Sequence, residues 1–186
     1  MQIDLARSKK RLLEILSFIG FIWIIFFIDQ FLPLEQYGVY PRRINGLTGV
    51  FAMPFLHANL SHLINNTIPL VVLLIVLSSV KTRFWSTVIG ISIVTGLLLW
   101  LFGRTSLHIG ASGLVFGLIG YLLAFGFKQK SFSAIVATVL VYTLYGGTII
   151  SGLSPLQSHV SWEGHLLGLI TGVLIAISTR DLIVDK

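Results

Sequence analysis

The sequence contains no cysteine, which excludes disulfides and thiolate metal sites. Charge is also scarce, because Asp, Glu, Lys and Arg make up 11% of the 186 residues, against about 25% in an average soluble domain. A soluble chain of this size needs more polar side chains than that to cover its surface. Apolar residues account for 55% of the chain, and this composition predicts an integral membrane protein.

The net charge of +6 could indicate a nucleic-acid partner. The basic residues, however, occur in short clusters between apolar stretches. Such clusters are typical of the cytoplasmic loops of a multi-pass membrane protein. We therefore expect this chain to be surrounded by the lipid bilayer, and we expect no nucleic-acid partner.

Six apolar stretches predict an all-α fold, a bundle of six transmembrane helices in a single domain over residues 1–186. The predicted spans are residues 12–28, 57–79, 84–102, 112–127, 132–150 and 162–179. Most of them approach the ~20 residues that cross ~30 Å of hydrocarbon. The fourth is short, because a helix of about 16 residues is only ~24 Å long. We expect it to begin below the membrane surface, beside a cavity lined by the preceding segment.

The distribution of Lys and Arg predicts the orientation of these spans. With the N-terminus inside, the inner segments hold ten basic residues: Arg7, Lys9, Lys10, Arg11, Lys81, Arg83, Lys128, Lys130, Arg180 and Lys186. The outer segments hold three: Arg42, Arg43 and Arg104. This bias places both termini in the cytoplasm and residues 29–56 in a long connection at the outer interface. The small architecture favours a prokaryotic inner membrane.

Polar residues lie at the outer ends of three predicted spans. His62 and Asn66 are at the start of the second span, Ser112 at the start of the fourth and His165 at the start of the sixth. Ionisable side chains are costly inside a membrane and indicate function. The sequence thus predicts one polar site at similar depth on the outer side.

Ser112 is part of Gly110-Ala111-Ser112-Gly113 and is predicted to begin a helix. The N–H groups and the dipole of a helix N-terminus favour a developing oxyanion. The flanking glycines let a peptide backbone approach the hydroxyl. The alternative is that Ser112 only caps the helix.

Glycines recur on the fourth and sixth spans at helical spacing: Gly113, Gly117 and Gly120, and Gly164, Gly168 and Gly172. Such stripes permit close helix packing. If the two stripes meet, Ser112 and His165 lie near each other at the outer end, as a Ser–His pair requires. The alternative is that the glycines only pack helices and His165 only caps one.

His62 and Asn66 are separated by one helical turn and point the same way. They could donate two hydrogen bonds to an oxyanion, together with the Ser112 N–H; the alternative is a helix-packing hydrogen bond. His57 is expected to anchor a loop. His108 and His159 are expected to be solvated or interfacial.

Three ordered motifs together resemble the rhomboid family of intramembrane serine proteases. They are His57-Ala58-Asn59-Leu60-Ser61-His62 followed by Asn66, Gly110-Ala111-Ser112-Gly113, and Gly164-His165 with Gly168 and Gly172. By this resemblance Ser112 is the nucleophile and His165 the general base, with no acidic third member. By the same resemblance, His62, Asn66 and the Ser112 N–H are expected to form the oxyanion hole.

The resemblance also implies supporting roles for Gly110, Gly113, Phe116, Gly168 and Gly172. Phe116 stands where members of the family often carry Tyr, and we expect its ring to stack on His165. Arg42 or Arg43 resembles the arginine that structures the first loop of the family.

The resemblance implies single-span membrane proteins as substrates, cut near the outer end of their helix. It implies no cofactor, and the histidines do not show the spacing of a His-Glu-x-x-His metal site. The sequence leaves the oligomeric state open. Two alternatives remain: a catalytically silent rhomboid-like binding protein, and a small transporter.

Overall fold

The computed structural model describes residues 2–80, 82–155 and 161–179. Within these residues the chain is helical, and the only strand-like contact is one antiparallel bridge between Val39 and His108. The helices are α1 (Gln2–Asp29), α2 (Gly49–Ala52), α3 (Leu60–Ser79), α4 (Phe84–Phe102), α5 (Ser112–Gln129), α6 (Phe132–Gly152) and α7 (Trp162–Ser178). Three 3₁₀ turns, η1 (Leu34–Tyr37), η2 (Ile44–Leu47) and η3 (Met53–Phe55), lie in the connection between α1 and α3.

The six long helices lie where the six spans were predicted, although only α4 keeps its predicted bounds. The largest difference is at α1, which begins at Gln2 instead of residue 12. Among the described helices, α1, α3, α4, α5 and α6 are long and apolar enough to cross a membrane. The sixth, α7, is apolar but has 17 residues, so it, rather than the 18-residue α5, is the shortest. The helix α3 starts at Leu60 instead of His57, because the Asn59 side chain caps it by accepting a hydrogen bond from the His62 N–H. The chain is a multi-pass membrane protein.

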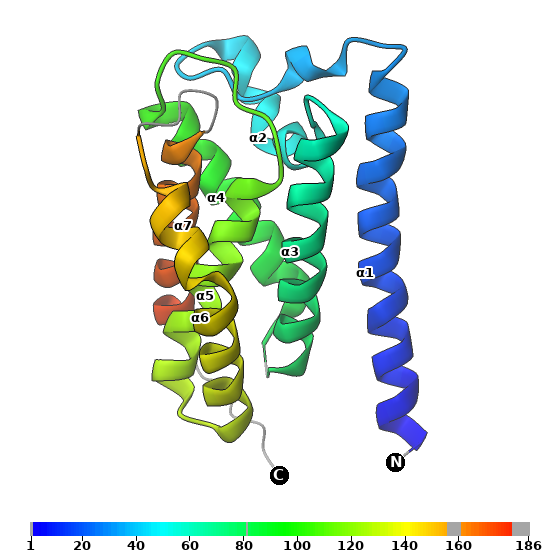
Figure 1. The fold of residues 1–186 in the computed structure, drawn as a ribbon, viewed down its shortest axis with the longest axis vertical. Helices are drawn as coiled ribbons and strands as arrows, with labels where there is room; N and C mark the ends of the chain where they lie inside the picture. The colour runs from blue at the N-terminus through cyan, green and yellow to red at the C-terminus, as the bar shows by residue number, and fades with distance from the viewer. Residues whose placement is uncertain (1, 81, 156–160, 180–186) are drawn as a thin grey trace.

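Helix α5 is the centre of the bundle. Two thirds of its length is buried, and it contacts α3, α4, α6 and α7. Figure 1 shows α1 standing at one side of the bundle, where it packs on α3. The α6 side chains that are buried, Ala134, Ala137 and Val141, all lie in its first half. No residue in the second half of α6, residues 142–152, is fully buried, so most of this half is packed more loosely.

The predicted glycine stripes of α5 and α7 do meet. A Cβ atom on Gly168 would overlap the Gly113 carbonyl oxygen, and one on Gly172 would overlap the carbonyl oxygen of Gly117. A Cβ on Gly120 would likewise overlap the Leu169 carbonyl. Since these nearest atoms all belong to backbone, the two helices approach as closely as their main chains allow.

The connection between α1 and α3 closes one end of the bundle, as Figure 1 shows in blue and cyan. Its Val39 and Met53 form a small apolar cluster with Leu99 of α4. The Arg42 side chain donates to the carbonyls of Leu101 (3.3 Å) and Gly103 (2.7 Å) at the end of α4. Arg42 is therefore the arginine that ties this connection down.

The opposite end carries basic residues on other helices. Arg11 of α1 pairs with Glu14 (2.8 Å) and lies over the Phe84 ring at the start of α4. Lys128 of α5 donates to backbone carbonyls at the end of α7, among them that of Ile177 (2.8 Å). The two predicted groups of basic residues thus lie at opposite ends of the bundle where the structure describes them.

Candidate active site

Ser112 is the first residue of α5 and follows a sharp turn. Gly110 has a φ of +111°, a left-handed conformation that favours glycine. A Cβ at Gly110 would also lie 2.6 Å from His62 Nε2, so a glycine is needed there for His62 to approach. No side chain caps the N-terminus of α5. Its first N–H groups are therefore available beside Ser112.

His165 lies in the first turn of α7 and is 7% exposed. Its Nδ1 is 2.8 Å from the carbonyl oxygen of Gly152, the last residue of α6. Because a carbonyl can only accept, the proton of the neutral imidazole lies on Nδ1. The Nε2 atom is left with a free lone pair, which is the state that a general base requires.

Phe116 stacks on the His165 imidazole, as the sequence predicted. The ring centroids are 4.1 Å apart and the planes differ by 3°. A Cβ on Gly152 would overlap Phe116 Cζ and lie 3.1 Å from His165 Nδ1. The end of α6 therefore packs directly against this ring pair, and the para position of Phe116 faces Gly152 closely.

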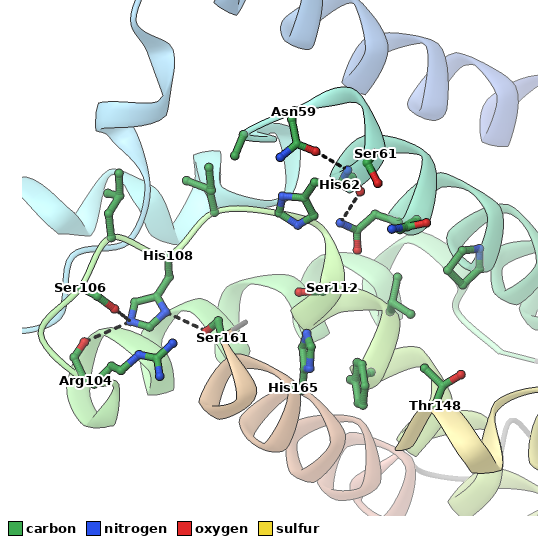
Figure 2. A pocket seen from close by; sticks show the side chains of 18 residues that line it. Asn59, Ser61, His62, Arg104, Ser106, His108, Ser112, Thr148, Ser161 and His165 are labelled. Carbon is green, nitrogen blue, oxygen red and sulfur yellow. Dashed lines mark hydrogen bonds between the residues drawn. The ribbon is translucent and has the colours of Figure 1, made fainter. Parts of the chain in front are cut away.

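Ser112 and His165 line the same pocket, which has a volume of about 850 Å³. Figure 2 shows the two side chains facing each other across the start of α5, with His62 on the far side of Ser112. No hydrogen bond joins the Ser112 hydroxyl to His165 in the part of the chain that the structure describes. Catalytic hydrogen bonds of this kind are often long without substrate and tighten when it binds.

His62 and Asn66 also line this pocket, on the α3 side. The Asn66 side-chain amide donates to the His62 carbonyl at 3.0 Å, which fixes its amide nitrogen near the pocket. A Cβ on Gly110 would lie 3.6 Å from the same nitrogen. Both α3 side chains thus approach the turn that precedes Ser112.

His57 anchors the turn that precedes Ser112, as was expected of this residue. It is 1% exposed, and its Nε2 accepts a hydrogen bond from the Ala111 N–H at 3.4 Å. Its ring meets that of His62 edge-on, with centroids 5.1 Å apart. Burial lowers the pKa of His57 to about 4, with a smaller contribution from the neighbouring His62. His57 is therefore neutral at physiological pH.

His108 was expected to be solvated or interfacial, and the structure shows that it is not solvated. His108 is 2% exposed, and its backbone pairs with Val39 in both directions. Its Nδ1 lies 2.7 Å from Ser161 Oγ, and its Nε2 lies 3.1 Å from the carbonyl of Arg104. Burial lowers the pKa of His108, an effect that the hydrogen bond to that carbonyl opposes. His159 lies outside the described residues.

Sequence reasoning missed two contacts of the site. Gly152 orients His165 through a main-chain carbonyl, and a carbonyl leaves no mark in the sequence. The partnership of His108 and Ser161 joins residues far apart in the chain. The signal that could have suggested Ser161 is its position directly before the apolar run of α7, because serine is a preferred N-cap. No cluster of His, Asp or Glu suited to a metal occurs among the described residues.

Comparisons with known proteins agree with this architecture. Residues 45–181 match the profile of the Rhomboid domain. An uncharacterized protein of Mycobacterium tuberculosis (strain ATCC 25618 / H37Rv) is 39% identical over 175 residues, covering 87% of this chain and 72% of the relative. An uncharacterized protein of Mycobacterium leprae is 37% identical over 176 residues, covering 87% of this chain and 68% of the relative. With its helical bundle, its close α5–α7 pair and this match over most of its length, the chain belongs to the rhomboid family.

Proposed function

We propose that this protein is an intramembrane serine protease with a Ser112–His165 dyad. The observation that carries the proposal is the 2.8 Å contact of His165 Nδ1 with the Gly152 carbonyl oxygen, in the pocket that Ser112 also lines. Because that oxygen can only accept, Nδ1 carries the proton and the Nε2 lone pair is available as a base. An uncapped helix N-terminus at Ser112 adds donors for a developing negative charge. The family to which the chain belongs makes this the chemistry to expect.

In the proposed reaction, Ser112 Oγ attacks the carbonyl carbon of a substrate peptide bond and His165 Nε2 takes the hydroxyl proton. The carbonyl oxygen becomes an oxyanion that accepts hydrogen bonds from the Ser112 N–H, His62 and Asn66. His165 then gives its proton to the leaving amine, and Ser112 carries the acyl group. A water molecule entering through the polar pocket then attacks this ester while His165 takes a proton from it. As the bond between the acyl carbon and Ser112 Oγ breaks, His165 returns that proton to Oγ and the carboxylic acid product leaves.

The proposed substrates are single-span membrane proteins cut near the outer end of their helix. The pocket supports this placement, because it opens among the loops at the end of the bundle that carries Arg42 and Arg104. This end holds few basic residues, so the positive-inside tendency assigns it to the outer face of the membrane. We also propose that residues 1–186 form a single rhomboid-like membrane domain.

The test uses the full chain in detergent with a fluorophosphonate probe and a single-span model substrate. The wild-type protein is expected to label and to cleave, whereas Ser112→Ala should do neither. Activity that persists in Ser112→Ala would refute the nucleophile, and full activity in His165→Ala would refute the base. A folded wild-type protein that neither labels nor cleaves a panel of such substrates would favour a silent binding protein.

The oxyanion role predicts a specific kinetic pattern. His62→Ala and Asn66→Ala should each lower kcat about 10²-fold, the scale seen for loss of one oxyanion donor. The KM should change little, because the donors act on charge that develops only in the transition state. A rise in KM with kcat unchanged would contradict this role.

The orientation can be tested cleanly because the chain has no cysteine. Single variants Thr105→Cys and Gln129→Cys place one thiol at each end of the bundle. In intact cells, a membrane-impermeant maleimide should label Thr105→Cys and leave Gln129→Cys unlabelled until the cells are opened. The reverse pattern would place the pocket on the cytoplasmic side.

A further inference from the structure

His108 is buried beside the start of α7, to one side of the candidate dyad in Figure 2. It belongs to the loop from Gly103 to Ala111 and lies four residues before Ser112. The main-chain pairing with Val39, through bonds of 2.8 and 2.9 Å, fixes its backbone. Its side chain points away from the loop toward the start of α7, as Figure 2 shows. The residue therefore joins the segment that leads into Ser112 to the helix that carries His165.

The hydrogen-bond partners of His108 determine its tautomer. His108 Nε2 lies 3.1 Å from the Arg104 carbonyl oxygen, which can only accept, and 3.2 Å from Ser106 Oγ, which can accept as well, so Nε2 carries the proton. In the neutral ring, Nδ1 is then an acceptor, and the Ser161 hydroxyl must donate to it across 2.7 Å. The direction of this bond is thus set by a main-chain carbonyl in the loop.

Ser161 passes this constraint to α7. As the N-cap residue, its Oγ accepts a hydrogen bond from the Gly164 N–H at 3.3 Å, and its carbonyl accepts one from the His165 N–H at 3.1 Å. Because its proton is donated to His108, its oxygen lone pairs remain for the cap. The first turn of α7, which holds His165, is therefore fixed through Ser161.

A second contact connects the same two segments. Arg104, at the start of the loop, approaches Glu163 of α7 with 3.5 Å between Nε and Oε1. Arg104 and Glu163 are also the charged groups that face His108. The loop thus contacts the start of α7 through two side-chain pairs, His108–Ser161 and Arg104–Glu163. The His108–Ser161 contact is the shorter and the more deeply buried of the two.

We infer that His108 is a positioning residue, which sets the place of His165 relative to Ser112 by bonding the N-cap of α7 to the loop that leads into Ser112. The inference rests on the proposed protease function. His108 itself does not touch the reacting atoms. Its loss shifts the first turn of α7, and a misplacement of the base of about 1 Å is enough to lower turnover by up to about 10²-fold.

The first experiment compares His108→Ala with His108→Asn in the full-length protein in detergent. Asparagine keeps an acceptor near the position of Nδ1, whereas alanine removes it. We expect His108→Ala to lower kcat about tenfold with KM within about twofold, and His108→Asn to recover most of that loss. An unchanged kcat in His108→Ala, or an equal loss in both variants, would overturn the inference.

A double-mutant cycle isolates the bond itself. If His108 acts through Ser161, the double variant His108→Ala/Ser161→Ala should be about as slow as Ser161→Ala alone. Losses that multiply would show two independent effects and overturn the link. Should His108→Ala fail to fold, Ser161→Ala and Ser161→Thr make the same comparison, because threonine keeps the hydroxyl. Wild-type turnover in a folded Ser161→Ala would then refute the inference.

A readout that needs no proteolysis separates this inference from the proposed function. In ¹⁵N-histidine-labelled protein, the signal that disappears in His165→Gln reports the His165 tautomer. We expect protonated Nδ1 in the wild type, a shift in His108→Ala and restoration in His108→Asn. An inactive wild type with this pattern would refute the protease and leave the positioning intact. An active wild type whose signal is unmoved in His108→Ala would refute the positioning alone.

Discussion

Phe116 and His165 lie parallel, with ring centroids 4.1 Å apart and planes within 3° of each other. The stack holds one face of the imidazole while the Gly152 carbonyl holds its Nδ1 edge. The position and the rotation of the His165 ring are thus both restricted, by Phe116 of α5 and by Gly152 of α6. Stacked aromatic pairs of this kind contribute about 0.5–1.5 kcal/mol beyond the area they bury.

The end of α6 should tolerate no added side chain at this ring pair. Gly152→Ala places a Cβ against Phe116 Cζ and near His165 Nδ1. We expect at least about a tenfold loss of kcat from the displaced imidazole. Gly147→Ala on the same helix is the matched control, because a Cβ at Gly147 would meet no atom within 4 Å. Equal activities of the two variants in the substrate assay would contradict the packing described.

The α5–α7 contact should be just as intolerant. Gly168→Ala forces a Cβ against the Gly113 carbonyl, which is backbone and cannot rotate away. Overpacking of this kind costs about 1–3 kcal/mol, so the midpoint of thermal unfolding in detergent should fall. Gly20→Ala on α1, where a Cβ meets nothing within 4 Å, should be neutral or slightly stabilising. A Gly168→Ala protein as stable as Gly20→Ala would refute the close approach.

Arg42 should matter for stability more than its neighbour Arg43. Arg42 donates to Gly103 O, Leu101 O and Thr105 Oγ1, whereas the Arg43 guanidinium lies over the Tyr40 ring. Because Arg42 has a φ of 61°, Arg42→Gly removes the side chain without backbone strain. We expect Arg42→Gly to lower the unfolding midpoint and Arg43→Ala to change it little. Equal shifts would show that the three hydrogen bonds of Arg42 contribute no more to stability than the contact of Arg43 with Tyr40.

The stability of the fold should decrease in acid through His57. Its pKa is about 4 in the folded protein and near 6.5 in the unfolded chain, so the unfolded chain binds the proton more tightly. The stabilisation is complete above pH 6.5 and is lost as the pH falls toward 4, up to about 3 kcal/mol. Burial lowers the pKa of His108, which adds to the same trend. Burial raises the pKa of Glu35, and its effect has the opposite sign.

The measurement is the unfolding midpoint between pH 7.5 and 4, a window set by these groups. His57→Gln keeps a neutral acceptor and retains His108 and Glu35, so only the His57 contribution disappears. The variant should lose less stability across this window than the wild type. Parallel pH curves for the two proteins would refute the buried neutral state of His57.

The helices could be predicted because a segment that crosses a bilayer needs a long apolar stretch, and such stretches stand out between the few charged residues of this chain. The α5–α7 contact could be anticipated because glycines recur at helical spacing on both helices, a pattern that permits close packing. The start of α3 was misplaced, since its bound depends on a cap by Asn59 rather than on hydropathy. His108 was misjudged because its burial arises from a pairing with Val39 and a bond to Ser161, both far away in the chain.

The backbone contact between α5 and α7 has a consequence for the lipid environment. Bilayers of different thickness tilt and bend helices at modest cost. Where Gly168 and Gly172 lie against main-chain atoms, no side chain can change rotamer or be compressed to absorb such a deformation. The two helices must therefore respond as one stiff body. The spacing of Ser112 and His165 should then vary little between thin and thick membranes.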